Sequence, residues 1–203
     1  MTALHTDPAM GNSNFARVSH DYYPTPAWMT FGLVDTFIDV QGTDNPIRFD
    51  ADWWEPACGE GHICEVLKGA IKGNMFATDL VYRGYGKGGC DFLKQPSAPP
   101  GVEMIFTNPP YGELAEKFIT HALDLMKPVQ GSVIMLMRNE YDCSKKRMKL
   151  FGGHPAYFGK AVATTRPRWI EGSTGSPRHN YAWYLWDWKS QNQAPRIFYF
   201  NKG

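Results

Sequence analysis

The residues with the clearest capacity for chemistry form the stretch Thr107-Asn108-Pro109-Pro110-Tyr111-Gly112. Asn108 can offer a side-chain oxygen as an acceptor, and Pro109 can offer only its carbonyl because proline has no N–H. Two acceptors aimed at the hydrogens of an amine on an aromatic ring favour the pyramidal form and free its lone pair. Tyr111 offers a flat face on which an extruded base can stack. The stretch predicts chemistry on such an amine, and the alternative is a Pro-Pro turn that only ends a strand.

The flanking segments place this stretch in a turn between a strand and a helix. Residues 102–106 form a short apolar run that is typical of a buried parallel strand. In open α/β sheets, ligands bind at the carboxyl edge of the strands, so we expect the turn to lie at a ligand site. Residues 113–126 are expected to form a helix, because their apolar positions recur at helical spacing, at Leu114, Phe118, Ala122, Leu125 and Met126.

A second candidate site lies earlier, where Glu55-Pro56-Ala57-Cys58-Gly59-Glu60-Gly61 joins an expected strand to an expected helix over residues 62–71. Glycines let a backbone turn sharply and pass close to a ligand. Asp79 follows an expected strand over 74–78, where a carboxylate can accept from both hydroxyls of a ribose. A nicotinamide cofactor needs the same geometry, but its fingerprint requires a small residue where Cys64 stands. The neutral loop entered by Glu55 favours a cationic sulfonium such as S-adenosylmethionine.

Together these motifs resemble those of the S-adenosylmethionine-dependent amino-methyltransferases of nucleic acids, whose signature is Asp/Asn-Pro-Pro-Tyr/Phe. Their order resembles most the adenine-specific DNA methyltransferases, and the short chain resembles the small phage-borne members. The resemblance covers roughly residues 20–190. It implies methyl transfer to the N6 amine of adenine in DNA after base flipping, with Asn108 where many members have Asp. The tetrapeptide is also shared with methyltransferases of RNA adenine and protein glutamine. These two substrates, and an inactive scaffold that only binds nucleic acid, remain the alternatives.

The resemblance also implies roles for individual residues. Thr25 is expected to cap a helix with Pro26 at its first position, and this helix start would bind the carboxylate of the methionine end of the cofactor. An ordinary capped helix is the alternative. Glu55 is expected near the methionine amine, and Asp91 at the adenine. The residues predicted to hold the cofactor are Tyr23, Thr25, Pro26, Glu55, Pro56, Ala57, Gly59, Gly61, Asp79, Leu80, Asp91, Phe92 and Asn108; the catalytic set is Asn108, Pro109, Pro110 and Tyr111.

The alternation of strand and helix patterns predicts an α/β fold with a doubly wound, mostly parallel sheet. Residues 131–137 are expected to form a central strand, and residues 181–188 a buried strand rich in aromatic rings. The resemblance implies the seven-stranded Rossmann-like sheet of class I methyltransferases, with residues 181–188 as its antiparallel closing strand. We expect residues 1–15 to be a flexible tail and residues 16–203 to be a single methyltransferase domain.

Positive charge is concentrated toward the C-terminus. Residues 1–137 hold nine Lys and Arg against sixteen Asp and Glu, whereas residues 138–203 hold twelve against four. Basic side chains interleaved with aromatic rings suit a phosphate backbone with unstacked bases, so residues 139–180 are expected to be a loop-rich, substrate-binding insertion. A solvated basic face is the alternative, as is core packing for Trp169. The predicted nucleic-acid contacts are Arg138, Lys145, Lys146, Arg147, Arg166, Arg168, Trp169 and Arg178.

The composition also bears on metal binding, membrane insertion and partners. The net charge is +1, and the four cysteines lack the paired spacing of a zinc site, so no metal is expected. The absence of a signal peptide or an apolar run near 20 residues predicts a cytoplasmic protein with no membrane span, in the host cytoplasm if a phage encodes it. The expected partner is DNA, with RNA as the alternative, and the chain is expected to be a monomer or a weak homodimer.

Overall fold

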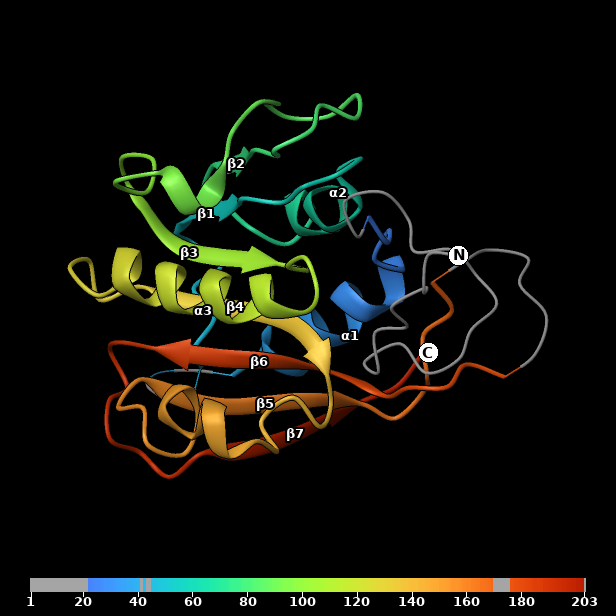
Figure 1. Ribbon diagram of the computed structural model, residues 1–203, viewed down its shortest axis with the longest axis vertical. Helices are drawn as coiled ribbons and strands as arrows, with labels where there is room; N and C mark the ends of the chain where they lie inside the picture. Colours follow the sequence, from blue (N-terminus) through green and yellow to red (C-terminus); the bar gives the residue numbers. More distant parts are fainter. Residues whose placement is uncertain (1–21, 41, 43–44, 170–175, 203) are drawn as a thin grey trace, which may run out of the picture.

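The computed structural model of this 203-residue chain describes residues 22–40, 42, 45–169 and 176–202. The tail expected over residues 1–15 lies outside the described residues. The described chain folds around a seven-stranded sheet with the order β2-β1-β3-β4-β6-β5-β7 (Figure 1). Its strands are β1 (Asp52–Glu55), β2 (Met75–Ala77), β3 (Val102–Thr107), β4 (Ser132–Arg138), β5 (Tyr157–Ala163), β6 (Tyr181–Asp187) and β7 (Arg196–Phe200).

Helices cover both faces of this sheet. α1 (Ala27–Phe37) and α2 (His62–Lys68) pack on one face, and α3 (Glu113–Met126) packs on the other, together with the 3₁₀ helices η4 (Phe92–Lys94) and η5 (Lys145–Leu150) (Figure 1). Successive residues of a strand point to opposite faces. Trp53 therefore joins the core under α1 and α2, whereas Trp54 joins the core under α3. The expected α/β doubly wound sheet is confirmed.

β6 is the antiparallel strand of the sheet. It runs antiparallel to both β4 and β5, while the other neighbouring strands pair in parallel. All seven residues of β6 are buried because strands flank it on both sides and core clusters cover both of its faces. The expectation of a buried, antiparallel, aromatic-rich strand is confirmed. This strand lies inside the sheet, whereas β7 forms the edge.

One sequence-based expectation about elements was wrong. Residues 139–180 were expected to be loop-rich, but they contain β5, a seven-residue strand that is largely buried between β6 and β7. Gly159 and Lys160 interrupt its apolar pattern, so β5 is recognisable only by its partners. In α3, Leu114 is 42% exposed, whereas the other four apolar positions of the helical pattern are buried or packed against the core.

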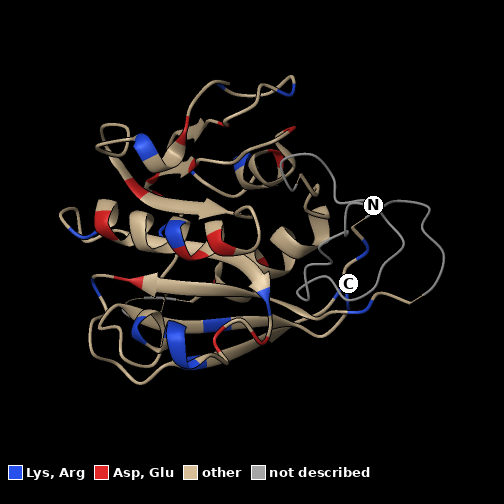
Figure 2. Cartoon of the chain, viewed as in Figure 1, with Lys and Arg blue, Asp and Glu red and all other residues tan. Residues whose placement is uncertain are grey.

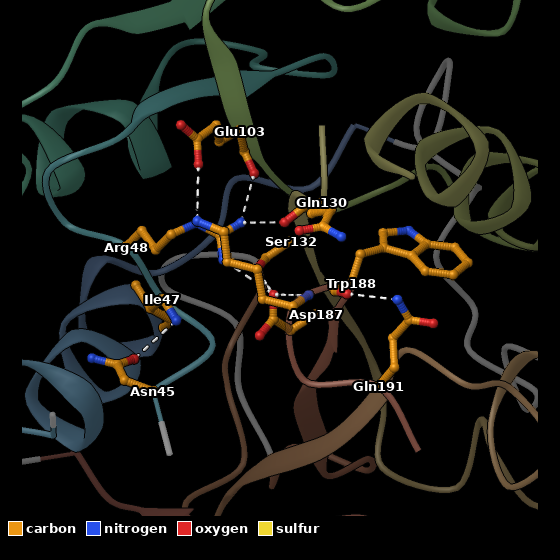
Figure 3. Close-up of polar contacts among 10 residues, drawn as sticks. Asn45, Ile47, Arg48, Glu103, Gln130, Ser132, Asp187, Trp188 and Gln191 are labelled. Atoms are coloured by element: carbon orange, nitrogen blue, oxygen red, sulfur yellow. Dashed lines mark hydrogen bonds and ion pairs between the residues drawn. The ribbon is translucent and has the colours of Figure 1, made fainter. Parts of the chain in front are cut away.

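A polar network ties the sheet together at the edge where β3 and β4 begin (Figure 3). Arg48 lies 3.1 Å from a carboxylate oxygen of Asp187 at the end of β6, and 3.4 Å from a carboxylate oxygen of Glu103 in β3. Ser132 donates a further hydrogen bond to Asp187. The Asp187 side chain is 2% exposed, so its charge depends on these partners. The network joins the chain before β1 to three strands.

Candidate active site

The predicted site residues meet at the opposite edge of the sheet, where the parallel strands end. Glu55 ends β1, Asp79 follows β2, Asn108 follows β3, and Arg138 ends β4. A cavity of about 310 Å³ opens there, at the lower end of the size range of small-molecule sites. Eleven of the thirteen residues predicted to hold a cofactor line it: Tyr23, Thr25, Glu55, Pro56, Ala57, Gly59, Asp79, Leu80, Asp91, Phe92 and Asn108.

Asn108 is held in one orientation. Its amide nitrogen donates to the main-chain carbonyl of Tyr23, at 3.3 Å, and to the hydroxyl of Thr25, at 3.1 Å. A carbonyl can only accept, so the nitrogen must face it and the side-chain oxygen must face away. That oxygen is buried and has no hydrogen-bond partner within the described residues. Asn108 therefore presents a fixed, unsatisfied acceptor at the cavity.

Glu55 is a buried carboxyl group in the wall of this cavity. It is 2% exposed, and the Cys64 thiol donates to its Oε2 atom at 3.0 Å. Burial raises the pKa of Glu55 to about 8; the nearby carboxylate of Asp79 adds to the rise, and the thiol opposes it. The group is therefore largely neutral at pH 7 without a ligand. A cation placed beside it would favour its ionised form.

Two further carboxylates line the same cavity. Asp79 accepts hydrogen bonds from the main-chain N–H of Gly59 and of Val81, each at 2.8 Å. These bonds fix the Asp79 carboxylate beside the glycine loop. Asp91 accepts from the N–H of Leu93 at 3.1 Å and so caps η4. Of the three carboxyl groups, Glu55 lies at the end of β1, whereas Asp79 and Asp91 lie in the chain between β2 and β3.

Helix α1 starts one residue later than predicted. The N-cap is Pro26 and not Thr25, and no side chain caps the helix. Thr25 is 4% exposed and its hydroxyl accepts from Asn108. Neither Pro26 nor the first residues of the helix line the cavity. The helix start does not open onto the site.

The two loop glycines have separate reasons to be glycine. Gly59 and Gly61 have φ of +55° and +85°, a region that favours glycine over residues with a side chain. Each also lies under an aromatic ring, since an added Cβ would meet Tyr22 at Gly59 and Tyr85 at Gly61, at 2.4 and 2.5 Å. Gly61 itself does not line the cavity, contrary to the prediction. It shapes the loop that does.

An aromatic cluster stands beside the Asn-Pro-Pro-Tyr turn. The ring of Tyr111 lies 5.8 Å from that of Tyr23 and 6.5 Å from those of Trp169 and Tyr181, and Trp169 lies 4.8 Å from Tyr181. The Tyr111 hydroxyl and the Trp169 indole nitrogen are buried and lack hydrogen-bond partners within the described chain. Burial raises the pKa of Tyr111 well above its usual value. Stacking of a base on Tyr111 would require its ring to leave this cluster.

An open groove of about 1260 Å³ begins at Tyr111 and runs between α3 and η5. Of the predicted nucleic-acid contacts, Arg138, Lys146 and Arg147 line it. The groove is not uniformly positive, because acidic residues of α3 and of the turn after β4 also line it. These are Glu113, Glu116, Asp124 and Glu140. Acidic positions of α3 are red in Figure 2. The charge separation along the chain therefore does not produce a purely basic surface.

The other predicted contacts lie away from the groove. Lys145 faces a separate hollow on η5. Arg166 donates to the side chain of Asn180 and to the carbonyl of Pro177, at 2.7 and 3.2 Å. Arg168 and Arg178 are exposed on the chain flanking residues 170–175, which lie outside the described residues.

Sequence reasoning overlooked several cavity residues. Tyr22 and Arg83 line it, and the guanidinium carbon of Arg83 lies 4.3 Å from the centre of the Tyr22 ring. Leu114 lines both the cavity and the groove. The only sequence signal for Arg83 was its place in the glycine-rich stretch 82–90, which carries no motif of its own. Pro110 lines the cavity, whereas Pro109 is buried and lines neither the cavity nor the groove.

Known proteins resemble this chain in their fold and not in their sequence. No protein-family model and no curated protein matches the sequence. A candidate class I S-adenosylmethionine-dependent methyltransferase from Listeria monocytogenes matches with a TM-score of 0.61 at 12% identity, over 93% of this chain and 68% of that one. The chain has the fold of class I methyltransferases.

Two further solved structures share this methyltransferase fold. A candidate RNA methyltransferase from Pyrococcus horikoshii matches with a TM-score of 0.59 at 13% identity, over 86% of this chain and 90% of that one. The methyltransferase subunit of a type I restriction-modification system from Streptococcus thermophilus has a TM-score of 0.54 at 14% identity, over 88% of this chain. This chain covers 47% of that subunit. In the described part of the chain, no cluster of metal-ligating side chains and no helix suited to crossing a membrane is found.

Proposed function

We propose that this protein transfers a methyl group from S-adenosylmethionine to the N6 amine of adenine in DNA, acting on a base that has left the stack. The observation that carries the proposal is the buried side-chain oxygen of Asn108, which lacks a partner among the described residues while its amide nitrogen is held by two acceptors. An unsatisfied buried acceptor costs about 1–3 kcal/mol. A donor that arrives with a substrate, such as an N–H of an amine, would satisfy it.

The lining of the cavity suits S-adenosylmethionine. That molecule carries an ammonium and a sulfonium, a ribose with two hydroxyls, and an adenine. Glu55 would face the ammonium, Asp79 would accept from the ribose hydroxyls, and Asp91 from the adenine amine, with Leu80 and Phe92 against the ring. When bound, the cofactor supplies an electrophilic methyl group on its sulfonium.

The chain's own residues would bind and orient the target amine. The Asn108 oxygen accepts one N–H of the amine and favours the pyramidal form, in which the lone pair is available. The main-chain carbonyl of Pro109 is proposed as the second acceptor. No strong general base is required, because the amine becomes acidic only after it is alkylated and can then release its proton to water.

We propose that the substrate is DNA and that it binds along the groove beside Tyr111. Arg138, Lys146 and Arg147 would contact phosphates along one wall. The aromatic cluster of Tyr23, Tyr111, Trp169 and Tyr181 would pack around the extruded base, and we propose that Tyr111 turns out of this cluster to stack on it. Fold relatives that include a restriction-modification methyltransferase subunit are consistent with this substrate.

A methyl-transfer assay tests the proposal. The purified chain is incubated with tritium-labelled S-adenosylmethionine and either duplex DNA or RNA, and the nucleosides are then identified by mass spectrometry. We expect N6-methyldeoxyadenosine with the wild type and none with Asn108→Ala, while Asn108→Ala still retains DNA in a filter-binding assay. Label found only in RNA, only on glutamine, or in no acceptor would replace the DNA proposal by the corresponding alternative.

A further inference from the structure

The anionic end of the proposed cofactor needs a partner that the sequence did not identify. The start of α1 was the expected partner, but it does not line the cavity, and prolines at positions 24 and 26 have no N–H to donate. The Thr25 hydroxyl is buried and accepts from Asn108, so its O–H offers at most one neutral donor. A positively charged partner for the carboxylate of the amino-acid part must come from elsewhere in the cavity.

The charges in the cavity wall leave few candidates for this role. Glu55, Asp79 and Asp91 would repel a carboxylate in their ionised forms. Among the described residues that line the cavity, Arg83 and His62 have side chains that can carry positive charge. Only the guanidinium is positive throughout the pH range in which proteins are folded.

Arg83 is arranged to bind an anion. Its guanidinium lies over the ring of Tyr22, which in turn lies on Gly59 of the glycine loop. No carboxylate forms an ion pair with Arg83 within the described residues. Stacking on an aromatic face occupies the flat side of a guanidinium and leaves its N–H edge free for a bidentate contact with a carboxylate.

We propose that Arg83 binds the carboxylate of the amino-acid part of the cofactor, with Tyr22 as the residue that positions it. This assignment rests on S-adenosylmethionine being the cofactor. It adds the residue that supplies positive charge to a cavity whose other charged groups are mostly acidic. It also gives the stretch 82–90, which the sequence left without a role, a function in cofactor binding.

The test compares two ligands that differ in the proposed contact. S-adenosylhomocysteine carries the amino-acid part, whereas 5′-methylthioadenosine keeps the adenosine and lacks the ammonium and the carboxylate. Isothermal titration calorimetry would give the Kd of each ligand for the wild type, Arg83→Ala, Arg83→Lys and Lys87→Ala. Lys87 is the matched control, because it is an exposed cation of the same stretch that does not line the cavity.

We expect Arg83→Ala to raise the Kd of S-adenosylhomocysteine by about 10- to 100-fold, which corresponds to the loss of a charged hydrogen-bonded contact. The Kd of 5′-methylthioadenosine should stay within twofold. The Kd of S-adenosylhomocysteine for Arg83→Lys should lie between those for Arg83→Ala and the wild type, since lysine keeps the positive charge but lacks the paired N–H donors of a guanidinium. Lys87→Ala should match the wild type for both ligands.

Three results would overturn the assignment of Arg83. Equal weakening of both ligands by Arg83→Ala would mean that Arg83 contacts the adenosine or only shapes the cavity. An unchanged Kd for both ligands would remove it from the site. If His62→Gln weakened the binding of S-adenosylhomocysteine alone, and Arg83→Ala did not weaken it, His62 would be the residue that binds the carboxylate. If the wild type binds neither ligand, the proposed cofactor itself is wrong.

Discussion

Glu55 should make cofactor binding depend on pH. Its carboxyl group is 2% exposed, and burial raises its pKa to about 8, so it is mostly protonated at neutral pH when the cavity holds no ligand. The ammonium of a bound cofactor would favour the carboxylate. Binding should then release a proton, about 0.9 per ligand at pH 7 for a pKa near 8.

The size of the effect follows from the same pKa. Below pH 8 the carboxylate must be formed at the expense of the neutral group, so the Kd of S-adenosylhomocysteine should rise about fivefold from pH 8 to pH 7 and about a further ninefold from pH 7 to pH 6. Glu55→Gln keeps the shape and removes the titration. Its Kd should stay constant over this range and lie above the Kd of the wild type at pH 8.

Calorimetry in buffers with different enthalpies of ionisation measures both the Kd and the number of protons released. A wild-type Kd that does not change between pH 6 and 8, or proton uptake on binding, would refute the assignment of Glu55 to a bound cation. A slope that persists in Glu55→Gln would show that another group titrates.

Glu55 also affects the stability of the protein when no ligand is bound. Its contribution to the free energy of unfolding falls as the pH rises, whereas that of an ion-paired carboxylate increases. The pKa of Glu55 is raised in the folded state from 4.5 to about 8, so the folded state holds the proton more tightly than the unfolded state. Its contribution to the free energy of unfolding is present below pH 4.5 and is lost as the pH rises toward 8, on the order of 5 kcal/mol in total. The thermal midpoint of the wild type should fall relative to that of Glu55→Gln across this window.

Three further predictions follow from particular contacts. Asn108→Asp should lower methyl transfer at least tenfold, because a carboxylate cannot donate to the main-chain carbonyl that the amide now binds at 3.3 Å. Arg48→Met should lower the free energy of unfolding by about 3 kcal/mol and the thermal midpoint by about 6–12 °C, since it leaves a buried carboxylate without its ion pair. Lys146→Ala combined with Arg147→Ala should reduce the slope of log K against log salt for DNA by about 1–2, because both residues line the groove, whereas Lys145→Ala should leave it unchanged.

Each of these has a result that would contradict it. Full activity of Asn108→Asp would show that the orientation of the amide is not needed, despite the fixed carbonyl beside it. An Arg48→Met protein as stable as the wild type would mean that Ser132 and the adjoining main chain suffice to hold Asp187. Equal changes in salt slope for Lys145→Ala and the double variant would place the DNA elsewhere on η5.

The strands of the first half and the Asn-Pro-Pro-Tyr turn could be predicted from the sequence because each signal is local. Residues 102–106 are an uninterrupted apolar run, and the helix that follows is amphipathic from Glu113 to Met126, as observed. A glycine loop between a strand and a helix, followed by an acidic residue after the next strand, likewise places its residues at one sheet edge through chain connectivity alone. These patterns place Glu55, Asp79 and Asn108 together.

The predictions that failed have a common cause, which is that each concerned residues whose partners lie far away in the sequence. β5 could not be recognised because its glycine and lysine break the apolar pattern of a strand. The strand is held instead by pairing with β6 and β7, which come later in the sequence. The cap was expected at Thr25, but the helix is capped at Pro26, and the Thr25 hydroxyl accepts instead from Asn108, 83 residues away. The basic segment 139–180 suggested a positive surface, but α3 brings acidic side chains to the same groove. Lys160, one of its basic residues, is turned inward to an ion pair with Asp142 at 2.8 Å.

The sequence by itself determined the α/β class, the order of strands and turns up to β4, and the residue types gathered where the parallel strands end, since these depend on periodicity and on the chemistry of single residues. Only the tertiary structure decided which way those residues face. The free oxygen of Asn108, the neutral state of Glu55, the closed aromatic cluster around Tyr111 and the place of Arg83 over Tyr22 all depend on contacts between segments far apart in the chain. Such contacts are set by packing, which a linear pattern does not encode.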